Sequence, residues 1–284
     1  MIMAFESFPE QFDSRVDAML EWLQDNASSL FDGINAGLQG MYQGLYWLLQ
    51  LPPFYVTALL LAALGWRLAG LRFALGTLVA MLCCAFIGLW AETMSTLALV
   101  VAATVLALLV AIPLGVVAGL LPALDRVVEP ALDLIQTLPP YIYLLPAIAL
   151  LGYGPGTALI ATFIVAFAPA FRLTALGIRM TPTAFVELGN ASGVTHWQMF
   201  SKIRLPFALP SIMAGVNQSL MMAFGMVVIA GIVGSGGLGQ VIYNAIRTLD
   251  IATSINAAIA IVILTMVIDR MAQSATPKAR ENRE

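Results

Sequence analysis

Residues 95–121 read STLALVVAATVLALLVAIPLGVVAGLL, and this stretch decides the fold class. It contains no charged residue and is longer than the roughly 20 apolar residues that a helix needs to cross about 30 Å of hydrocarbon. It lacks the period-2 alternation of a barrel strand. We therefore expect a membrane-spanning α-helix here.

The rest of the chain has the same character. Hydrophobic residues make up 60% of the 284 residues and charged residues only 10%, against about 25% charged residues in a soluble domain. Helices satisfy their own backbone hydrogen bonds in lipid, so the composition predicts an all-α integral membrane protein with about seven spans. The candidate spans are residues 53–66, 72–90, 95–121, 137–152, 155–175, 207–232 and 255–271.

Lysine and arginine predict the orientation, because short cytoplasmic loops are enriched in both. If the polar segment at 176–206 is cytoplasmic, alternation also places Arg67, Arg72 and Arg126 inside. We therefore expect the N-terminus outside and the C-terminus inside. Residues 1–50 are acidic and alternate between apolar and polar positions, which favours an amphipathic helix on the outer membrane surface over a poorly ordered tail.

A polar segment interrupts the apolar sequence at residues 187–206, ELGNASGVTHWQMFSKIRLP. Residues 183–188 read as a helix start, Gly193 permits a sharp turn, and Thr195 opens a second short helix. That helix carries Trp197 and Phe200, and exposed aromatic residues commonly anchor protein interfaces. The segment therefore reads as a docking surface outside the membrane.

This segment resembles the "EAA" loop by which permease subunits of ABC importers meet their ATPase. The chain reads Glu-Leu-Gly where that family favours Glu-Ala-Ala, while the glycine and the Ile-x-Leu-Pro spacing match. The resemblance implies an all-α, type I importer transmembrane domain, with ATPase contacts made by Glu187, Leu188, Gly189, Gly193, Trp197, Phe200, Ile203, Leu205 and Pro206.

Three further blocks, residues 132–154, 171–182 and 214–243, are similar to the quaternary-amine branch of these permeases, which carry glycine betaine, proline betaine and choline. This resemblance implies a permease for a compatible solute, foremost glycine betaine, in the bacterial inner membrane. Choline, trimethylamine oxide, proline and methionine are the alternative solutes. The implied partners are a second permease copy, two ATPase subunits and an extracytoplasmic substrate-binding protein.

The same resemblance divides the chain into parts. Residues 1–50 form the extracytoplasmic surface segment, 51–94 the accessory transmembrane helices, and 95–271 the core permease domain. The core includes the coupling loop at 176–206, and 272–284 form a cytoplasmic tail.

The chain offers no catalytic constellation and no phosphate-binding loop, so we expect a non-catalytic subunit whose partner ATPase binds ATP and magnesium. His196 has no plausible partner ligands, and we expect no metal and no other cofactor in this chain. An ion-driven secondary transporter is a weaker alternative. It should carry buried Asp, Glu or Arg side chains within its spans, and the candidate spans are almost free of acidic groups apart from Asp269 at a boundary. A membrane scaffold would need neither polar in-span residues nor the glycine-rich loop described below.

Polar residues at membrane depth are candidates for the translocation pathway, although they could equally bond between helices. Tyrosine faces could contact a passing cation, or the tyrosines could anchor at the interface. Prolines there would kink the helices that line a cavity. The candidate pathway residues are Gln136, Pro139, Pro140, Tyr141, Tyr143, Asn217, Gln218, Met221 and Met222.

Two smaller features leave alternatives open. One is a charged patch that either contacts the ATPase or balances its own charges, and it consists of Asp125, Arg126, Glu129 and Asp133.

The other is a G-x-G-x-x-G spacing. It follows a membrane span instead of a strand, so a nucleotide site is rejected. We expect a flexible outer-face loop that feeds a short re-entrant or surface helix, with Gly234, Ser235, Gly236, Gly237 and Gly239 in the loop.

Overall fold

The structure is a computed structural model that describes residues 2–275, with side chains described from residue 11 onward. Most of the described residues are helical, and none forms a strand. The predicted all-α membrane fold is therefore confirmed. The helices are α1 (Ile2–Gln50), α2 (Phe54–Ala69), α3 (Leu71–Phe86), α4 (Trp90–Leu120), α5 (Pro122–Thr137), α6 (Tyr141–Leu151), α7 (Pro155–Arg179), α8 (Thr183–Ala191), α9 (His196–Gln198), η1 (Met199–Arg204), α10 (Leu205–Ala230), η2 (Gly231–Val233), α11 (Gly237–Thr248) and α12 (Ile251–Ala275).

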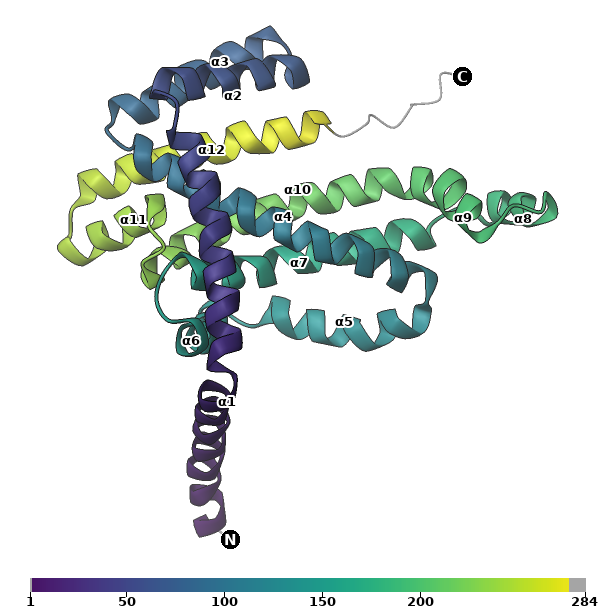
Figure 1. Cartoon of the computed structure of the whole chain (residues 1–284), viewed down its shortest axis with the longest axis horizontal. Coiled ribbons are helices and arrows are strands. Elements are labelled where there is room, and N and C mark those ends of the chain that lie inside the picture. Colours follow the sequence, from purple (N-terminus) through teal and green to yellow (C-terminus); the bar gives the residue numbers. More distant parts are fainter. Residues whose placement is uncertain (1, 276–284) are drawn as a thin grey trace.

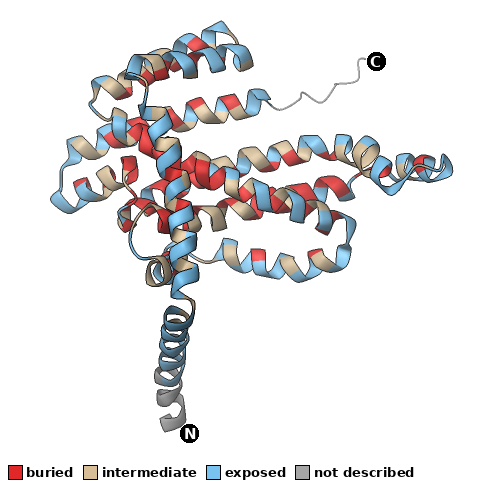
Figure 2. Ribbon diagram, in the orientation of Figure 1, coloured by how far each residue is buried: buried red, intermediate tan, exposed pale blue. Residues whose placement is uncertain are grey.

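Helices α4, α7 and α10 form the centre of the molecule and run side by side (Figure 1). Small residues let their backbones approach closely, as is common between membrane helices. A Cβ atom added at Gly115 of α4 would lie 2.8 Å from the Phe171 carbonyl oxygen of α7. A Cβ atom at Gly177 would lie 2.8 Å from Ser211 Cβ of α10. The buried residues concentrate along these three helices and where α1 crosses them (Figure 2).

Helix α1 runs across the bundle, and its N-terminal half projects beyond it (Figure 1). Its C-terminal half is part of the core, because Leu38 and Tyr42 are buried and the Tyr42 hydroxyl lies 2.7 Å from Ser95 Oγ of α4. Asn35 Nδ2 donates to the Leu151 carbonyl oxygen at the C-terminus of α6. The first fifty residues are thus a helix throughout their described part, and half of that helix is integral to the bundle.

Prolines produce two sharp breaks. A residue before proline is pushed away from helical geometry, and Leu138, which precedes Pro139, is extended with φ −70° and ψ 138°. Helices α5 and α6 therefore meet at 100°, and α1 and α2 meet at 99° beside Pro52 and Pro53. The span predicted at 137–152 is consequently not one helix, since α6 begins only at Tyr141.

Among the described residues, four helices are long and apolar enough to cross a membrane: Trp90–Leu120, Pro155–Arg179, His196–Val233 and Ile251–Ala275. The number rises to six if each bent pair is one span. Helices α2 and α3 have 16 residues each, which is about 24 Å of helix and short of the hydrocarbon thickness. The count of seven spans and its orientation stay predictions. The predicted tail at 272–284 lies mostly outside the described residues.

Candidate functional site

The polar segment forms a helical projection at one end of the bundle, joined to α7 on one side and to α10 on the other (Figure 1). Helix α8 ends in a turn at Gly193, whose φ of +69° is a left-handed conformation that suits glycine. Thr195 then caps α9 by a reciprocal pair of bonds with Gln198, at 3.3 Å and 2.9 Å. The two predicted helices and the turn between them are present.

Gly189 allows close packing inside this projection. A Cβ atom there would lie 2.8 Å from both Ile203 Cδ1 and Met199 Cε, so the glycine lets η1 pack directly on α8. Leu205 and Pro206 open α10, where a proline in the first turn costs no helical hydrogen bond. The departure from the Glu-Ala-Ala pattern at position 189 thus has a packing reason.

The outer surface of the projection carries exposed apolar side chains among polar ones. The exposed fractions are 64% for Leu188 and 71% for Trp197. The Trp197 and Phe200 rings lie 5.7 Å apart between centroids, with Phe200 half-buried. Glu187 is exposed next to Leu188. This is the surface that the sequence predicts for docking.

A cavity of about 270 Å³ lies between α5, α6, α7 and α10. It brings together four of the candidate pathway residues: Gln136, Pro140, Tyr143 and Met222. The polar groups at its wall are held in place, since Gln136 Oε1 accepts a 2.7 Å bond from Arg172 Nη1 and the Tyr143 hydroxyl donates to backbone carbonyl oxygens of residues 135 and 138. The remaining lining residues are Ile135, Leu138, Val165, Gly225, Met226 and Ile229.

The other candidate pathway residues lie outside this cavity. Tyr141 and Met221 are 55% and 44% exposed, and Pro139 and Gln218 are exposed as well. Asn217 is half-buried, and its Oδ1 atom has no hydrogen-bond partner among the described residues. The pathway and interhelical readings of Asn217 both stay predictions.

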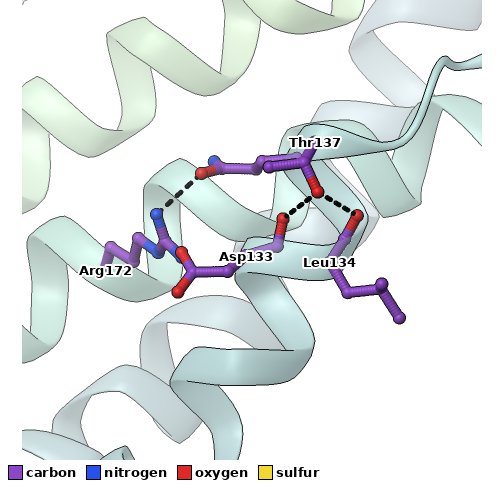
Figure 3. A network of polar contacts seen from close by, with 5 residues as sticks. Asp133, Leu134, Thr137 and Arg172 are labelled. Atoms are coloured by element: carbon purple, nitrogen blue, oxygen red, sulfur yellow. Dashed lines mark hydrogen bonds and ion pairs between the residues drawn. The ribbon is translucent and has the colours of Figure 1, made fainter.

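Two ion pairs that the sequence did not predict join α5 to α7. Arg179 Nη1 lies 2.5 Å from Asp125 Oδ2, and Arg172 pairs with Asp133. Figure 3 shows Arg172 reaching Asp133 and the neighbouring glutamine amide. The charged patch does not balance itself through Arg126, whose Nε donates to the Pro122 carbonyl oxygen of its own helix.

The spacing of the charged residues in the sequence could have predicted these pairs. The arginines on α7 are seven residues apart and the aspartates on α5 are eight apart, and both separations are close to two turns of helix. Each pair of like charges therefore shares one face of its helix. Helices that run antiparallel can join two such faces at two points.

The glycine-rich loop packs against neighbouring helices, whereas the sequence predicts a flexible loop. Ser235 is buried, and its Oγ donates to the Ala230 carbonyl oxygen. The Leu238 amide donates to Thr96 Oγ1 of α4 over 2.9 Å. Gly234, Gly236 and Gly237 all have positive φ, and a Cβ atom at Gly239 would lie 2.1 Å from the Val227 carbonyl oxygen. The expected short helix is α11, which begins at Gly237, so Gly237 and Gly239 belong to its first turn and not to the loop as predicted.

Residues 111–281 match the family described as binding-protein-dependent transport system inner membrane component. The chain belongs to this family. The match covers α7, the α8–α9 projection and α10. The resemblance drawn from the projection and the later blocks is therefore confirmed.

Named members of this family resemble the chain over most of its length. It is 37% identical to the glycine betaine transport system permease protein OpuAB of Bacillus subtilis, over 93% of this chain and 94% of that one. It is 35% identical to the glycine betaine/proline betaine permease ProW of Escherichia coli, over 94% of this chain and 76% of that one.

Solved structures agree on the fold of this inner membrane component. A chain of the MetNI methionine ABC transporter, in an inward-facing conformation, aligns with a TM-score of 0.57 at 24% identity. The alignment covers 66% of this chain and 96% of that one. At this identity the likeness supports the fold alone.

Proposed function

We propose that this chain is the membrane permease of an ATP-driven importer for glycine betaine. The observation that carries the proposal is the α8–α9 projection, which exposes Leu188 and Trp197 and is fixed at both ends to long bundle helices. A partner that grips this surface can move α7 and α10 as rigid bodies, the kind of displacement that packed helices support. The chain itself acts as a non-catalytic subunit.

The residues of the coupling loop would contact the ATPase through Leu188, Trp197 and Phe200, with Glu187 as a charged contact at the edge. Gly189, Gly193 and Ile203 would hold the loop's shape from within. The ATPase would supply bound ATP and magnesium, so no cofactor is needed in this chain.

The solute assignment follows from the named relatives, which include permeases for glycine betaine, proline betaine and carnitine. The 270 Å³ cavity is compatible with a small solute, and the Tyr143 ring at its wall could contact a quaternary ammonium group. We assign the pathway to this cavity together with the exposed face of α10 that carries Gln218 and Met221. Choline, trimethylamine oxide, proline and methionine remain the alternative solutes.

The full assembly would contain two permease copies, two ATPase subunits and an extracytoplasmic binding protein in the bacterial inner membrane. A homodimer is proposed because each chain carries one α8–α9 projection and would engage one ATPase.

Reconstitution tests the proposal. The chain is purified with the ATPase and binding protein encoded beside it and placed in liposomes, and accumulation of radiolabelled glycine betaine is measured with ATP inside. We expect uptake that needs ATP and that excess unlabelled glycine betaine abolishes. Uptake driven by an ion gradient without the ATPase would contradict the mechanism, and accumulation of a different solute alone would contradict the substrate.

A further inference from the structure

Helix α5 is attached to α7 near both of its ends by the two ion pairs. Asp125 is 8% exposed and pairs with Arg179, while Asp133 is 63% exposed and pairs with Arg172. Asp125 is therefore the one carboxylate of the two pairs that is shielded from water, while Arg179 stays 37% exposed. Removing Arg179 would leave the buried Asp125 charge without its partner.

Arg179, the last residue of α7, also faces the α8–α9 projection, which is the part of the coupling loop beyond α7. Its side chain lines a pocket of about 220 Å³ with Asp125 and Glu129 on the α5 side. It lines a second pocket, of about 240 Å³, with Glu187 and Arg204 on the loop side. Arg179 thus stands between α5 and the base of the coupling loop.

The other end of α5 reaches the candidate pathway. Arg172 holds Asp133 and, through the 2.7 Å bond, Gln136, which lines the 270 Å³ cavity. Figure 3 shows these groups converging from α5 and α7. The Arg172 Nε atom is buried and has no partner among the described residues, so Gln136 and Asp133 account for the side chain's polar contacts there.

Apolar contacts also hold α5 against α7. Leu132 is buried in a cluster with Phe171 of α7, and Leu124 and Val128 pack against the same cluster. Of the sixteen residues of α5 only Asp125 and Leu132 are buried. It begins with Pro122 and ends at the 100° break before α6. A helix bounded by two proline breaks and attached through a few side chains can move as a rod when those attachments move.

We propose that Arg179 and Arg172 are positioning residues that pass displacement of the coupling loop to α5 and from there to the wall of the translocation cavity. Movement of the loop displaces the C-terminal end of α7, and the Arg179–Asp125 ion pair makes α5 move with it. The bond from Arg172 then keeps Gln136 at a fixed position relative to α7. This inference rests on the proposed function and names the side chains through which the coupling acts.

The test measures solute moved per ATP hydrolysed by the reconstituted complex, because this ratio reports coupling and not yield or assembly. For Arg179→Gln we expect ATP hydrolysis to persist while the ratio falls about tenfold. The control is Arg67→Gln, which removes the same charge from an exposed position in the last turn of α2; its ratio should equal that of the wild type.

A charge exchange separates the ion pair from a simple fold defect. Asp125→Arg combined with Arg179→Asp restores the pair in the opposite sense, and we expect it to recover at least half of the wild-type ratio, whereas each single change should not. An unchanged ratio in Arg179→Gln, or no recovery in the exchange variant when its ATPase assembly is normal, would overturn the inference. If the wild-type complex itself fails to import, the proposed function fails instead.

Discussion

Gly193 of the coupling loop has a backbone conformation that few other residues adopt. Its φ of +69° lies in the left-handed region, where an L residue costs roughly 1–2 kcal/mol and a β-branched residue fits worst. No neighbour lies within 4 Å of an added Cβ atom, so the cost is conformational and not a clash.

We therefore expect Gly193→Val to reduce glycine betaine uptake at least tenfold while the chain still inserts into the membrane. Uptake and membrane abundance are measured on the same cells. The adjacent exposed Ser192, with φ −82°, is the matched control, and Ser192→Val should transport normally. Normal uptake by Gly193→Val would show that this turn does not set the shape of the loop.

Gly239 tests the packing of the glycine-rich loop. Its Cβ atom would lie 2.1 Å from the Val227 carbonyl oxygen, so Gly239→Ala must push α11 away from α10. We expect a loss of about 1–3 kcal/mol of stability, typical of overpacking. Thermal unfolding of the purified protein measures it, with Gly44→Ala as the control because nothing lies within 4 Å there. Equal melting temperatures for Gly239→Ala and the wild type would contradict the close approach.

At the scale of helices, α12 begins at a carboxylate cap. The Thr253 amide donates to Asp250 Oδ1 over 3.1 Å and the Thr253 hydroxyl to Oδ2 over 2.7 Å. These bonds hold the pKa of Asp250 below its ordinary value of 3.8. Because the pKa is lowered in the folded state, the stabilisation that the cap gives to the folded protein is present above pH 3.8. It is lost as the pH falls through the lower pKa of the folded state.

We expect Asp250→Ala to lower the melting temperature at pH 7, since the cap satisfies a free amide at the helix start. The difference from the wild type should shrink as pH falls below 3.8, where the wild-type carboxylate also becomes protonated. Melting curves from pH 7 to pH 2 measure this. A difference that stays constant over that range would show that the charged form is not what stabilises α12.

Sequence periodicity and proline positions predicted much of the helical layout, since hydrophobic length and breaker residues act locally. The α8–α9 projection was predictable residue by residue, because Gly193 and Thr195 encode their own turn and cap. The α5–α7 ion pairs were not predicted, because Asp125 and Arg179 are far apart in sequence and only packing brings them together. The buried state of the glycine-rich loop likewise depends on Thr96 of another helix.

At the scale of the whole molecule, the coupling mechanism requires that one end of the bundle faces the ATPase and that the other end faces the binding protein. Leu249, at the turn between α11 and α12, is 84% exposed, while the α8–α9 projection lies at the opposite end of the bundle (Figure 1). The orientation predicted from the basic residues places the projection in the cytoplasm. The coupling mechanism fails if this orientation is reversed.

Cysteine labelling with a membrane-impermeant maleimide tests the orientation most directly. Cys83 and Cys84 are first replaced by alanine, and single cysteines are introduced as His196→Cys in the projection and Leu249→Cys at the opposite end. In right-side-out vesicles we expect Leu249→Cys to react and His196→Cys to react only after the membrane is permeabilised. Labelling of His196→Cys in sealed right-side-out vesicles would contradict the central claim that this loop meets a cytoplasmic ATPase.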